Sequence, residues 1–432
     1  MIQFIKITNF GPIREEVELS FEALESDGSN AYEISMPDKR KLLKLAYIYG
    51  ANASGKTTVL RGFEFLRDLW LNPAYQKDEA LKYDPFLFCP NPEEYSSGIE
   101  LAFYVDGIRY IYNLSFSKEA IISEKMVFYR TIQPTELFSR STDLDKRVSY
   151  IEFGSQIKVA QKEIDSLQSV TLYNNTVLGA FEKANVDIPE LEKLNKWAIA
   201  SFMPMINSGT DLTGWTAAKI SDDPSLGKWM NTFLNKADKN IREVTVKVDR
   251  EYLPKDTFSK IAQDPNVNKE QIRRMRDGVV TRSEINFVHG TQNDSHYQLP
   301  IEKESSGSKR YFGLGGILYQ ALTNPRFVCI DELDTSLHAD LMKYFLQLFL
   351  LNSEHSQMLI TTHNLFLLEE QDFVRKDALW FSEKGENGEV SLYSAADFDS
   401  STLRKGASLI NAYKSGRLGA KPNLGSPYLK QD

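Results

Sequence analysis

The chain has 432 residues, of which 42% are hydrophobic and 25% charged, and its formal net charge is −8 at pH 7. This length and composition predict a folded protein of about three domain-sized units, and the negative charge means that nucleic acid could bind only at a local basic face. No stretch approaches the roughly 18 apolar residues of a membrane span, and Lys6 inside the apolar N-terminal stretch favours a strand over a signal peptide. Cys89 and Cys329 are the only cysteines and lie far apart, which argues against disulfides and zinc sites. We therefore expect a cytoplasmic protein without a membrane partner.

A strand, a glycine-rich loop and a helix are predicted in succession between residues 45 and 66. Leu45–Tyr49 reads as a short buried strand and Thr58–Leu66 as the first turns of a helix. Between them, Gly-Ala-Asn-Ala-Ser-Gly-Lys-Thr matches the Walker A pattern G-x-x-x-x-G-K-[ST] at every position. Backbone N–H groups of such a loop surround phosphates, and the helix N-terminus adds partial positive charge. The pattern predicts an ATP site formed by Gly50, Asn52, Ala53, Ser54, Gly55, Lys56, Thr57 and Thr58.

Two side chains of this loop have predicted roles of their own. Lys56 would reach the β- and γ-phosphates, and Thr57 would place its hydroxyl on Mg²⁺. A chance glycine-rich turn before a helix is the alternative, and the strand and helix on either side of the loop argue against it.

The rest of the chain alternates between strand-like and helical patterns. From about residue 156 to 240, apolar residues recur at helical spacing without sustained heptads, which predicts a helical lobe. A polar, charged segment covers residues 264–277. The Asp106–Gly107 pair predicts a hairpin turn between two strands. Strand-like segments are residues 99–105, 108–114, 125–129, 241–253 and 281–288.

Two acidic residues follow the apolar segment Phe327–Ile330. Asp331 and Glu332 stand directly after this segment, as in a Walker B motif. Asp331 would hold Mg²⁺ through water, and Glu332 would act as the general base that orients and deprotonates the attacking water. The alternative is an exposed strand end, but two acids at the end of a buried strand would be costly without a use.

A third strand, Met358–Thr362, ends at His363, which lies 31 residues after Glu332. The strand–helix–strand spacing predicts a parallel crossover, so both strands would end at the same edge of the sheet, where open α/β sheets bind ligands. His363 would reach the γ-phosphate from there. A lone histidine is more often structural, and only this placement favours a catalytic role.

This pattern resembles the ABC-type ATPases of the SMC and OLD lineage. In addition to the Walker motifs, Asp334 lies at the centre of a segment similar to the D-loop, and Thr362-His363-Asn364 is similar to the H-loop. Residues 304–310 resemble a degenerate signature motif, in which Ser306 and Gly307 fit while Ser308 replaces a glycine. No glutamine is a clear Q-loop residue, although Gln76 and the segment Tyr83–Phe86 are candidates.

The resemblance implies an α/β fold with an ABC-type P-loop NTPase core, in which helices flank a mixed sheet. Residues 1–155 would form the N-terminal half of this core, 156–240 an inserted helical lobe and 241–432 the C-terminal half. Ser306, Gly307, Ser308 and Asp334 would act across a homodimer that sandwiches two nucleotides, and larger assemblies of such dimers are conceivable.

Both ends of the chain narrow the resemblance to the OLD-like, AAA-family ATP-binding proteins of prokaryotes. The segments that carry it are Phe4–Pro12 and Tyr413–Pro422. Members include ATPase components of phage-defence systems of the RloA/AbiL type and of PARIS. The resemblance implies a sensor or scaffold that controls a separate nuclease or toxic effector encoded nearby, with a phage protein as a candidate trigger.

Two other functions compete with this one. A DNA-repair ATPase of the SMC-like, long-armed kind would need extended heptads and a cysteine hook, and both are absent. A transporter ATPase subunit would need a surface that couples to a membrane partner. A TOPRIM nuclease domain, as in OLD proteins, would not fit into the 69 residues after His363.

Basic residues form two clusters that could contact nucleic acid or an acidic partner. A solvated surface balanced by Glu270, Asp277 and Glu284 is the alternative. The clusters consist of Arg273, Arg274, Arg276 and Arg282, and of Lys303, Lys309 and Arg310.

Overall fold

The computed structural model describes residues 1–24, 30–252, 279–291, 293, 295–370, 374–398 and 408–421. The chain folds into two units. The first consists of Met1–Ser208, Ala321–Thr335 and Met342–Asp432, and the second of Gly209–Gln320 and Ser336–Leu341. Each unit therefore joins segments that are distant in the sequence.

A seven-stranded antiparallel sheet with the order β10-β9-β8-β7-β6-β1-β2 forms one layer of the first unit. The N-terminal strand lies between β2 and β6 and pairs with both. Asp106 and Gly107 turn the chain between β6 and β7 with φ values of 48° and 78°, as a tight hairpin requires. The strands are β1 (Ile2–Thr8), β2 (Val17–Ser20), β6 (Ser97–Val105), β7 (Ile108–Phe116), β8 (Ile121–Tyr129), β9 (Thr135–Asp143) and β10 (Val148–Phe153).

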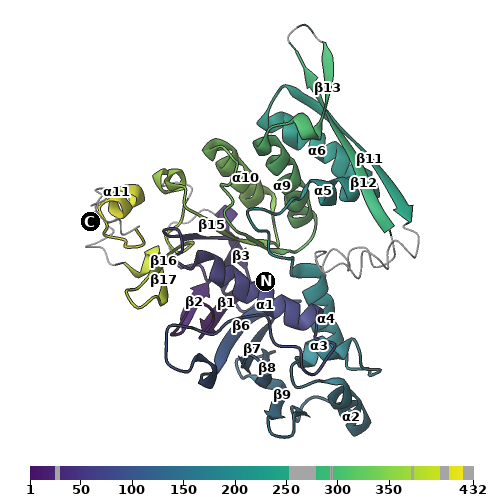
Figure 1. Ribbon diagram of the computed structural model, residues 1–432, viewed down its shortest axis with the longest axis vertical. Helices are drawn as coiled ribbons and strands as arrows, with labels where there is room; N and C mark the ends of the chain where they lie inside the picture. The colour runs from purple at the N-terminus through teal and green to yellow at the C-terminus, as the bar shows by residue number, and fades with distance from the viewer. Residues whose placement is uncertain are drawn as a thin grey trace, which may run out of the picture. The chain divides into compact units, whose positions relative to one another are not determined.

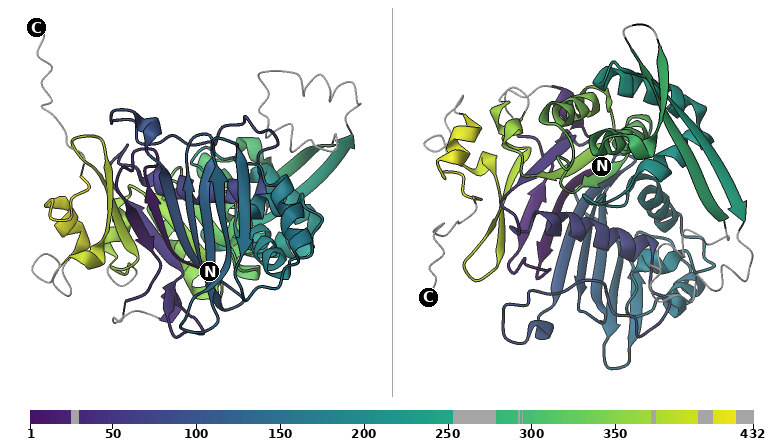
Figure 2. Two further views of the ribbon diagram at one scale, coloured as in Figure 1. Left: turned by 90° about the horizontal axis from the view of Figure 1, so that it is seen from below. Right: turned by 45° about the horizontal axis from the view of Figure 1, so that its top comes forward.

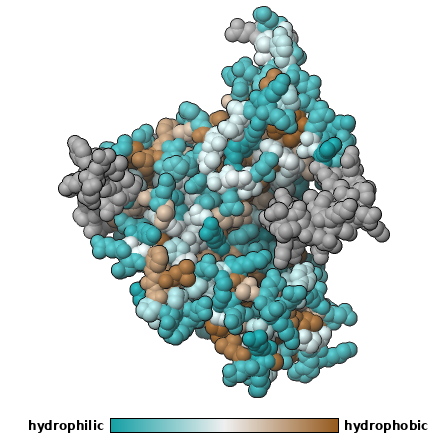
Figure 3. All heavy atoms as spheres, in the orientation of Figure 1, coloured by the Kyte–Doolittle hydropathy of each residue, from teal (hydrophilic) through white to brown (hydrophobic). Residues whose placement is uncertain are grey.

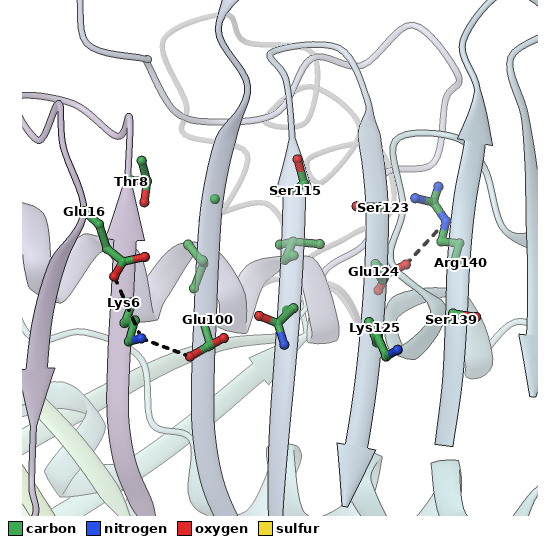
Figure 4. A pocket seen from close by; sticks show the side chains of 14 residues that line it. Lys6, Thr8, Glu16, Glu100, Ser115, Ser123, Glu124, Lys125, Ser139 and Arg140 are labelled. Carbon is green, nitrogen blue, oxygen red and sulfur yellow. Dashed lines mark ion pairs between the residues drawn. The ribbon is translucent and has the colours of Figure 1, made fainter. Parts of the chain in front are cut away.

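Charged side chains on this sheet form two kinds of ion pair (Figure 4). Lys6 on β1 lies 3.8 Å from Glu16 and 3.5 Å from Glu100 on β6, where all three side chains are partly exposed. Glu124 on β8 and Arg140 on β9 are fully buried, with 3.4 Å between Nε and the carboxylate. Glu124 also accepts a 3.0 Å hydrogen bond from the backbone N–H of Val177. The buried pair therefore ties the sheet to the helical segment that begins there.

A five-stranded mixed sheet forms the second layer of this unit, with the order β14-β15-β5-β16-β17. All neighbouring strands are parallel except β16 and β17. Strands β14, β15 and β5 are buried along their whole length, as expected for parallel strands covered on both faces. The strands are β5 (Leu45–Tyr49), β14 (Phe327–Ile330), β15 (Gln357–Thr362), β16 (Leu379–Lys384) and β17 (Val390–Ser394), and β3 (Glu33–Ser35) and β4 (Lys41–Leu43) form a separate hairpin.

Helix α1 (Lys56–Leu71) lies across the seven-stranded sheet (Figure 2). A Cβ atom at Gly62 would lie 2.4 Å from Cδ1 of Ile7, so a larger residue there would displace the Ile7 side chain. Further along the helix, the ring of Phe65 lies 4.9 Å from that of Phe116. This packing fixes the helix that begins at Lys56, and hence the loop before it.

The remaining elements of the first unit surround these layers (Figure 1). Helices α2 (Gln161–Val170), α3 (Val177–Phe181) and α4 (Pro189–Ser201) follow β10, and α11 (Leu409–Lys414) lies near the C-terminal end. Helix α10 (Ala339–Asn352) lies mostly in this unit. Short 3₁₀ helices are η1 (Asn30–Tyr32), η2 (Pro92–Glu94), η4 (Leu365–Glu369) and η5 (Ala395–Asp397).

The second unit packs helices against a three-stranded antiparallel sheet with the order β11-β12-β13. The ring of Phe233 stacks on that of Tyr311 at 4.4 Å, which joins α6 to α9 in its core. Its elements are α5 (Thr213–Asp222), α6 (Pro224–Ala237), β11 (Ile241–Tyr252), β12 (Val279–Gly290), β13 (His296–Pro300), η3 (Ile301–Lys303) and most of α9 (Ser306–Thr323).

The structure confirms the predicted α/β P-loop fold with a mixed sheet and flanking helices, and each predicted strand lies within or close to an observed one. Helices α2 to α6 occupy the region predicted to be helical. The predicted domain boundaries at residues 155 and 240 stay a prediction. Arg273, Arg274 and Arg276 of the basic cluster lie outside the described residues.

The face of the molecule in Figure 3 is mostly hydrophilic, with hydrophobic residues in separate patches. Among the helices of the described residues, none has both the length and the hydrophobicity that a membrane span requires.

Candidate functional site

The loop between β5 and α1, which carries the predicted Walker A residues, has a left-handed backbone at two positions. Ala53 and Gly55 both adopt left-handed conformations, with φ values of 61° and 93°. A Cβ atom at Gly55 would lie 2.5 Å from a methyl group of Val390, so a larger residue would meet both strain and a clash. One at Gly50 would lie 2.4 Å from the carbonyl oxygen of Ser382. Both glycines are therefore required by local geometry.

Lys56 bridges the loop that precedes it. Its ammonium donates hydrogen bonds of 2.9 Å to the carbonyl oxygens of Gly50 and Ala51. Burial lowers the pKa of the Lys56 ammonium, and the nearby carboxylates, Glu332 first among them, oppose this shift. The lysine is thus held at the loop with acidic groups around it.

A chain of hydrogen bonds joins the loop to the end of β14. The Thr57 hydroxyl donates to both carboxylate oxygens of Asp331, at 3.1 and 3.0 Å. The Thr361 hydroxyl, from the neighbouring strand β15, donates to Asp331 at 2.6 Å and accepts from the backbone N–H of Glu332 at 2.8 Å. Parallel pairing of β14 with β15 brings these residues to one sheet edge. The predicted metal residues, Thr57 and Asp331, are therefore in direct contact.

Glu332 has a strained backbone. Its φ is 47°, a conformation that a residue with a Cβ rarely adopts. The Thr335 N–H donates to its carbonyl oxygen at 3.0 Å, and the Thr335 hydroxyl lies 3.5 Å from its carboxylate. Such strain persists only where the surrounding structure enforces it, and it is concentrated at functional sites.

His363 follows β15 and pairs with the predicted D-loop residue. Its Nδ1 lies 3.2 Å from the carboxylate of Asp334. The side chain of Asp334 is only 5% exposed, whereas that of His363 is 58% exposed. Asp334 can therefore orient the imidazole while leaving it accessible to a ligand.

A family model described as "AAA domain, putative AbiEii toxin, Type IV TA system" matches residues 45–369. The chain belongs to this family of AAA domains. The match runs from the first residue of β5 to the last of η4. It therefore includes the loop before α1, the two carboxylates after β14 and His363.

Two solved structures are similar to this AAA domain over most of its length. The SMC head domain from Thermotoga maritima is 13% identical to this chain. The match covers 91% of this chain and 98% of the SMC head chain, with a TM-score of 0.39. A structure of the SmcHead bound to the C-winged helix domain of ScpA is 12% identical, with coverages of 91% and 97% and a TM-score of 0.42. None of the curated proteins compared with the chain matched it.

The predicted signature residues of the AAA domain begin helix α9 in the second unit. The Ser305 hydroxyl accepts a 3.0 Å hydrogen bond from the Ser308 N–H and lies 3.0 Å from the Ser308 hydroxyl. A Cβ atom at Gly307 would lie 2.9 Å from the carbonyl oxygen of Ser336. Ser306 is the first residue of the helix. Their action across a dimer stays a prediction.

Neither Q-loop candidate has a clear catalytic placement. Gln76 is exposed, and its carbonyl oxygen accepts a hydrogen bond from Asn174. The ring of Tyr83 is stacked on Phe10 at 5.6 Å, in an aromatic cluster. Tyr83 and Asp84 line, together with Thr58, a cavity of about 370 Å³ beside α1. The assignment of a Q-loop residue stays open.

Two buried hydroxyl groups near the loop, those of Thr361 and Ser382, were not predicted from the sequence to belong to the site. The Ser382 hydroxyl donates a 2.6 Å hydrogen bond to the carbonyl oxygen of Ser54, which fixes the loop against β16. Both residues are fully buried polar residues of parallel strands. A buried hydroxyl within an apolar strand needs a partner, and this was the only available sign of their role.

Proposed function

We propose that the chain binds ATP with Mg²⁺ and hydrolyses it at the loop of residues 50–58 and the end of β14. The hydrogen-bond chain from Thr57 through Asp331 and Thr361 to Glu332 carries this proposal. It brings together a hydroxyl of the loop, a carboxylate suited to a metal and a second carboxylate. Mg²⁺ prefers oxygen ligands and usually keeps several waters, so Thr57 and Asp331 fit this metal, which would offset phosphate charge.

Three side chains have separate roles in the proposed reaction. The ammonium of Lys56 would exchange a loop carbonyl for a phosphate oxygen, since charge-assisted bonds are stronger than neutral ones. Glu332 would take a proton from the attacking water. His363, held by Asp334, would contact the γ-phosphate.

Removal of divalent cations tests the metal requirement. We expect the purified chain to release phosphate from ATP in the presence of Mg²⁺ and to stop when EDTA is added. An excess of Mg²⁺ should restore the rate. Hydrolysis that continues in EDTA would contradict the assignment of Thr57 and Asp331.

We further propose that this ATPase is the sensor and scaffold of a prokaryotic anti-phage defence system. The resemblance of its two ends to the RloA/AbiL and PARIS ATPases supports this role, as does a family description that refers to a toxin–antitoxin system. Residues 413–421 of the C-terminal motif are packed against the fold. Tyr413 donates a 3.0 Å hydrogen bond to the carbonyl oxygen of Ala420, and Tyr393 of β17 donates one of 2.9 Å to that of Leu418.

A separate effector, a nuclease or another toxic protein, would carry out the damaging reaction. Within the described residues, no group of three or more His, Cys, Asp or Glu side chains is placed to hold a metal ion as a metal-dependent nuclease would need. ATP would hold one conformation of the scaffold, and hydrolysis or a phage protein would release the effector by shifting that equilibrium.

The alternative is that the chain is itself the toxic component, which the family description favours. Expression of the chain alone, of its neighbouring gene alone and of both together distinguishes the two. We expect phage protection only from the pair, and its loss when the chain carries Glu332→Gln. Growth arrest by the chain alone, without the neighbouring gene, would favour the toxin.

A further inference from the structure

A cavity of about 920 Å³ lies beside the loop before α1, between this loop, the end of β16 and the C-terminal segment. Its lining includes Gly50 and Ser54 of the loop and His363. Lys56 and Asp331, on which the proposed ATP chemistry depends, do not line it. The volume lies within the range of about 300–1,000 Å³ that is typical of ligand sites. The cavity is therefore a space next to the proposed ATP site that this chemistry leaves without a role.

The cavity is basic, although the chain as a whole is acidic. Three lysines line it, Lys384 at the end of β16, Lys414 at the end of α11, and Lys421. Among the described residues of the lining, Glu383 is the only acid, and its carboxylate accepts a 3.2 Å hydrogen bond from the Tyr393 hydroxyl. The lining therefore carries an excess of positive charge, which favours an anionic ligand.

The three lysines are available to such a ligand. All of them are exposed, and none forms an ion pair within the part of the chain that the structure describes. The Lys421 ammonium donates a 2.7 Å hydrogen bond to the carbonyl oxygen of Lys414, and the Lys384 ammonium lies 5.9 Å from the centre of the Phe88 ring. Phosphate oxygens would be stronger partners than a neutral carbonyl group, because they are charged.

The C-terminal segment extends the basic surface beyond the cavity. Residues 408–421 contain no acidic residue and three basic ones, Lys414, Arg417 and Lys421. This segment packs on the five-stranded sheet (Figure 1), where the ring of Tyr413 is stacked on that of Phe381 at 6.1 Å. Its cations are therefore held next to the cavity by the fold.

An exposed aromatic ring lies beside the cavity. The Phe88 side chain is 68% exposed, and its ring lies against Gly388 in the turn between β16 and β17. Gly385, at the start of this turn, lines the cavity. The ring of Phe86 meets that of Phe88 edge-on at 5.9 Å and supports it. An exposed ring next to a row of cations offers a face on which a nucleic-acid base can stack.

We propose that this surface, formed by Lys384, Lys414, Arg417, Lys421 and Phe88, binds single-stranded nucleic acid. The cations would contact successive phosphates, and one base would stack on Phe88. A single strand can turn its bases toward such a ring, whereas the bases of a duplex are paired and stacked with each other. This binding goes beyond the proposed function and needs no ATP hydrolysis.

Fluorescence anisotropy of a labelled strand of about 12 nucleotides tests the site, since related grooves cover about 4–16 nucleotides. Thymidine and uridine oligonucleotides serve as the DNA and RNA probes. We expect the full chain to bind at least one of them saturably and more weakly as the salt concentration rises. Failure to bind either strand at low salt would overturn the proposal.

Two matched triple variants locate the phosphate contacts. Changing all three lysines of the cavity to glutamine should lower the slope of log affinity against log salt by about 2, at about 0.7 for each phosphate contact. The same change at three exposed lysines of the second unit should leave the slope as it is. The first variant combines Lys384→Gln, Lys414→Gln and Lys421→Gln, and the second combines Lys228→Gln, Lys236→Gln and Lys239→Gln. Equal slopes in the two variants would place the strand elsewhere.

Phe88→Ala tests the stacking. It should weaken binding by about fivefold to a hundredfold, on the usual size of a base–aromatic contact, and leave the salt slope unchanged. Lys56→Ala should bind the strand like the wild type, so a failure of the ATP proposal would leave this result intact. A duplex that binds as tightly as the single strand would contradict the proposal. Displacement of the strand by polyglutamate at equal charge would assign the surface to an acidic protein instead.

Discussion

Two opposing effects act on the charge of the Lys56 ammonium. Burial disfavours its charge, and the carboxylates at the end of β14 favour it. Its present partners are two carbonyl oxygens of the loop. Phosphate oxygens would be stronger partners because they are charged.

Lys56→Ala should therefore weaken ATP binding strongly. Loss of one charge-assisted hydrogen bond costs about 1.5–3 kcal/mol, or about tenfold to a hundredfold in affinity. Titration with a fluorescent ATP analogue measures it, and Lys228→Ala, at an exposed position of α6, serves as the control. Unchanged affinity in Lys56→Ala would exclude the proposed site.

Glu332→Gln should separate ATP binding from hydrolysis. Glutamine keeps the shape of the side chain but cannot accept a proton from water, so turnover should fall about 10²-fold or more, while ATP affinity stays the same. Steady-state phosphate release and equilibrium binding give the two values. If turnover is normal, another residue activates the water.

Thr361→Val tests the hydroxyl that connects the two acids. Valine is nearly isosteric, but it leaves Asp331 without one donor and the Glu332 N–H without its acceptor. The free energy of unfolding should fall by about 1–3 kcal/mol, and turnover should fall with it. Chemical denaturation and phosphate release measure both. Thr361→Ser, which retains the hydroxyl, should behave like the wild type.

The secondary-structure elements show why some parts of the site were predictable and others were not. The loop before α1 could be predicted because its glycines, Lys56 and Thr57 are consecutive in the sequence. The acids after β14 and His363 were recognisable because each follows a short strand that is largely apolar. Thr361 could not be assigned a role, since its partner Asp331 is 30 residues away and depends on the register of β14 and β15.

The pairing of segments that are distant in the chain could not be predicted from the sequence either. The placement of β1 between β2 and β6 depends on contacts almost 100 residues apart. Residues 202–206 show no strand pattern of their own, yet they pair with β14. Such pairing is set by tertiary packing, which local periodicity does not contain.

The buried pair of Glu124 and Arg140 gives a prediction at the level of elements. Each partner also bonds to the backbone of the helical segment, at Val177 and Tyr173. Glu124→Gln or Arg140→Met alone should lower the free energy of unfolding by about 3–5 kcal/mol, because each leaves an uncompensated buried charge. The double variant should lose less than the sum of the two. Denaturation of the three variants forms the cycle, and additive losses would show that the pair is not coupled.

At the scale of the whole molecule, the proposed ATP loop and the signature residues belong to different units. The loop before α1 lies in the first unit, and Ser306 and Gly307 lie in the second. A two-fold dimer would form two composite sites at one interface, in which Ser306 of one copy contacts the phosphate held by the other.

The chain should therefore form a dimer on ATP binding when hydrolysis is blocked. Glu332→Gln with ATP and Mg²⁺ should double its mass from that of a single 49.3 kDa chain, as measured by sedimentation or light scattering. Adding Ser306→Arg, which would introduce bulk and charge at the interface, should keep it monomeric. A Glu332→Gln chain that stays monomeric with saturating ATP would contradict the sandwich.

The parallel pairing of residues 202–206 with β14 has a mechanical consequence. The first unit ends at Ser208, just beyond Ile206, and the chain then enters the second unit. A pull along this connection would load the backbone hydrogen bonds to Cys329 and Asp331 in shear, so that they would bear the force together rather than open one at a time. The connection is therefore anchored at the backbone N–H of Asp331, the proposed metal ligand. Tension on the second unit would therefore reach the backbone of Asp331 through the main chain.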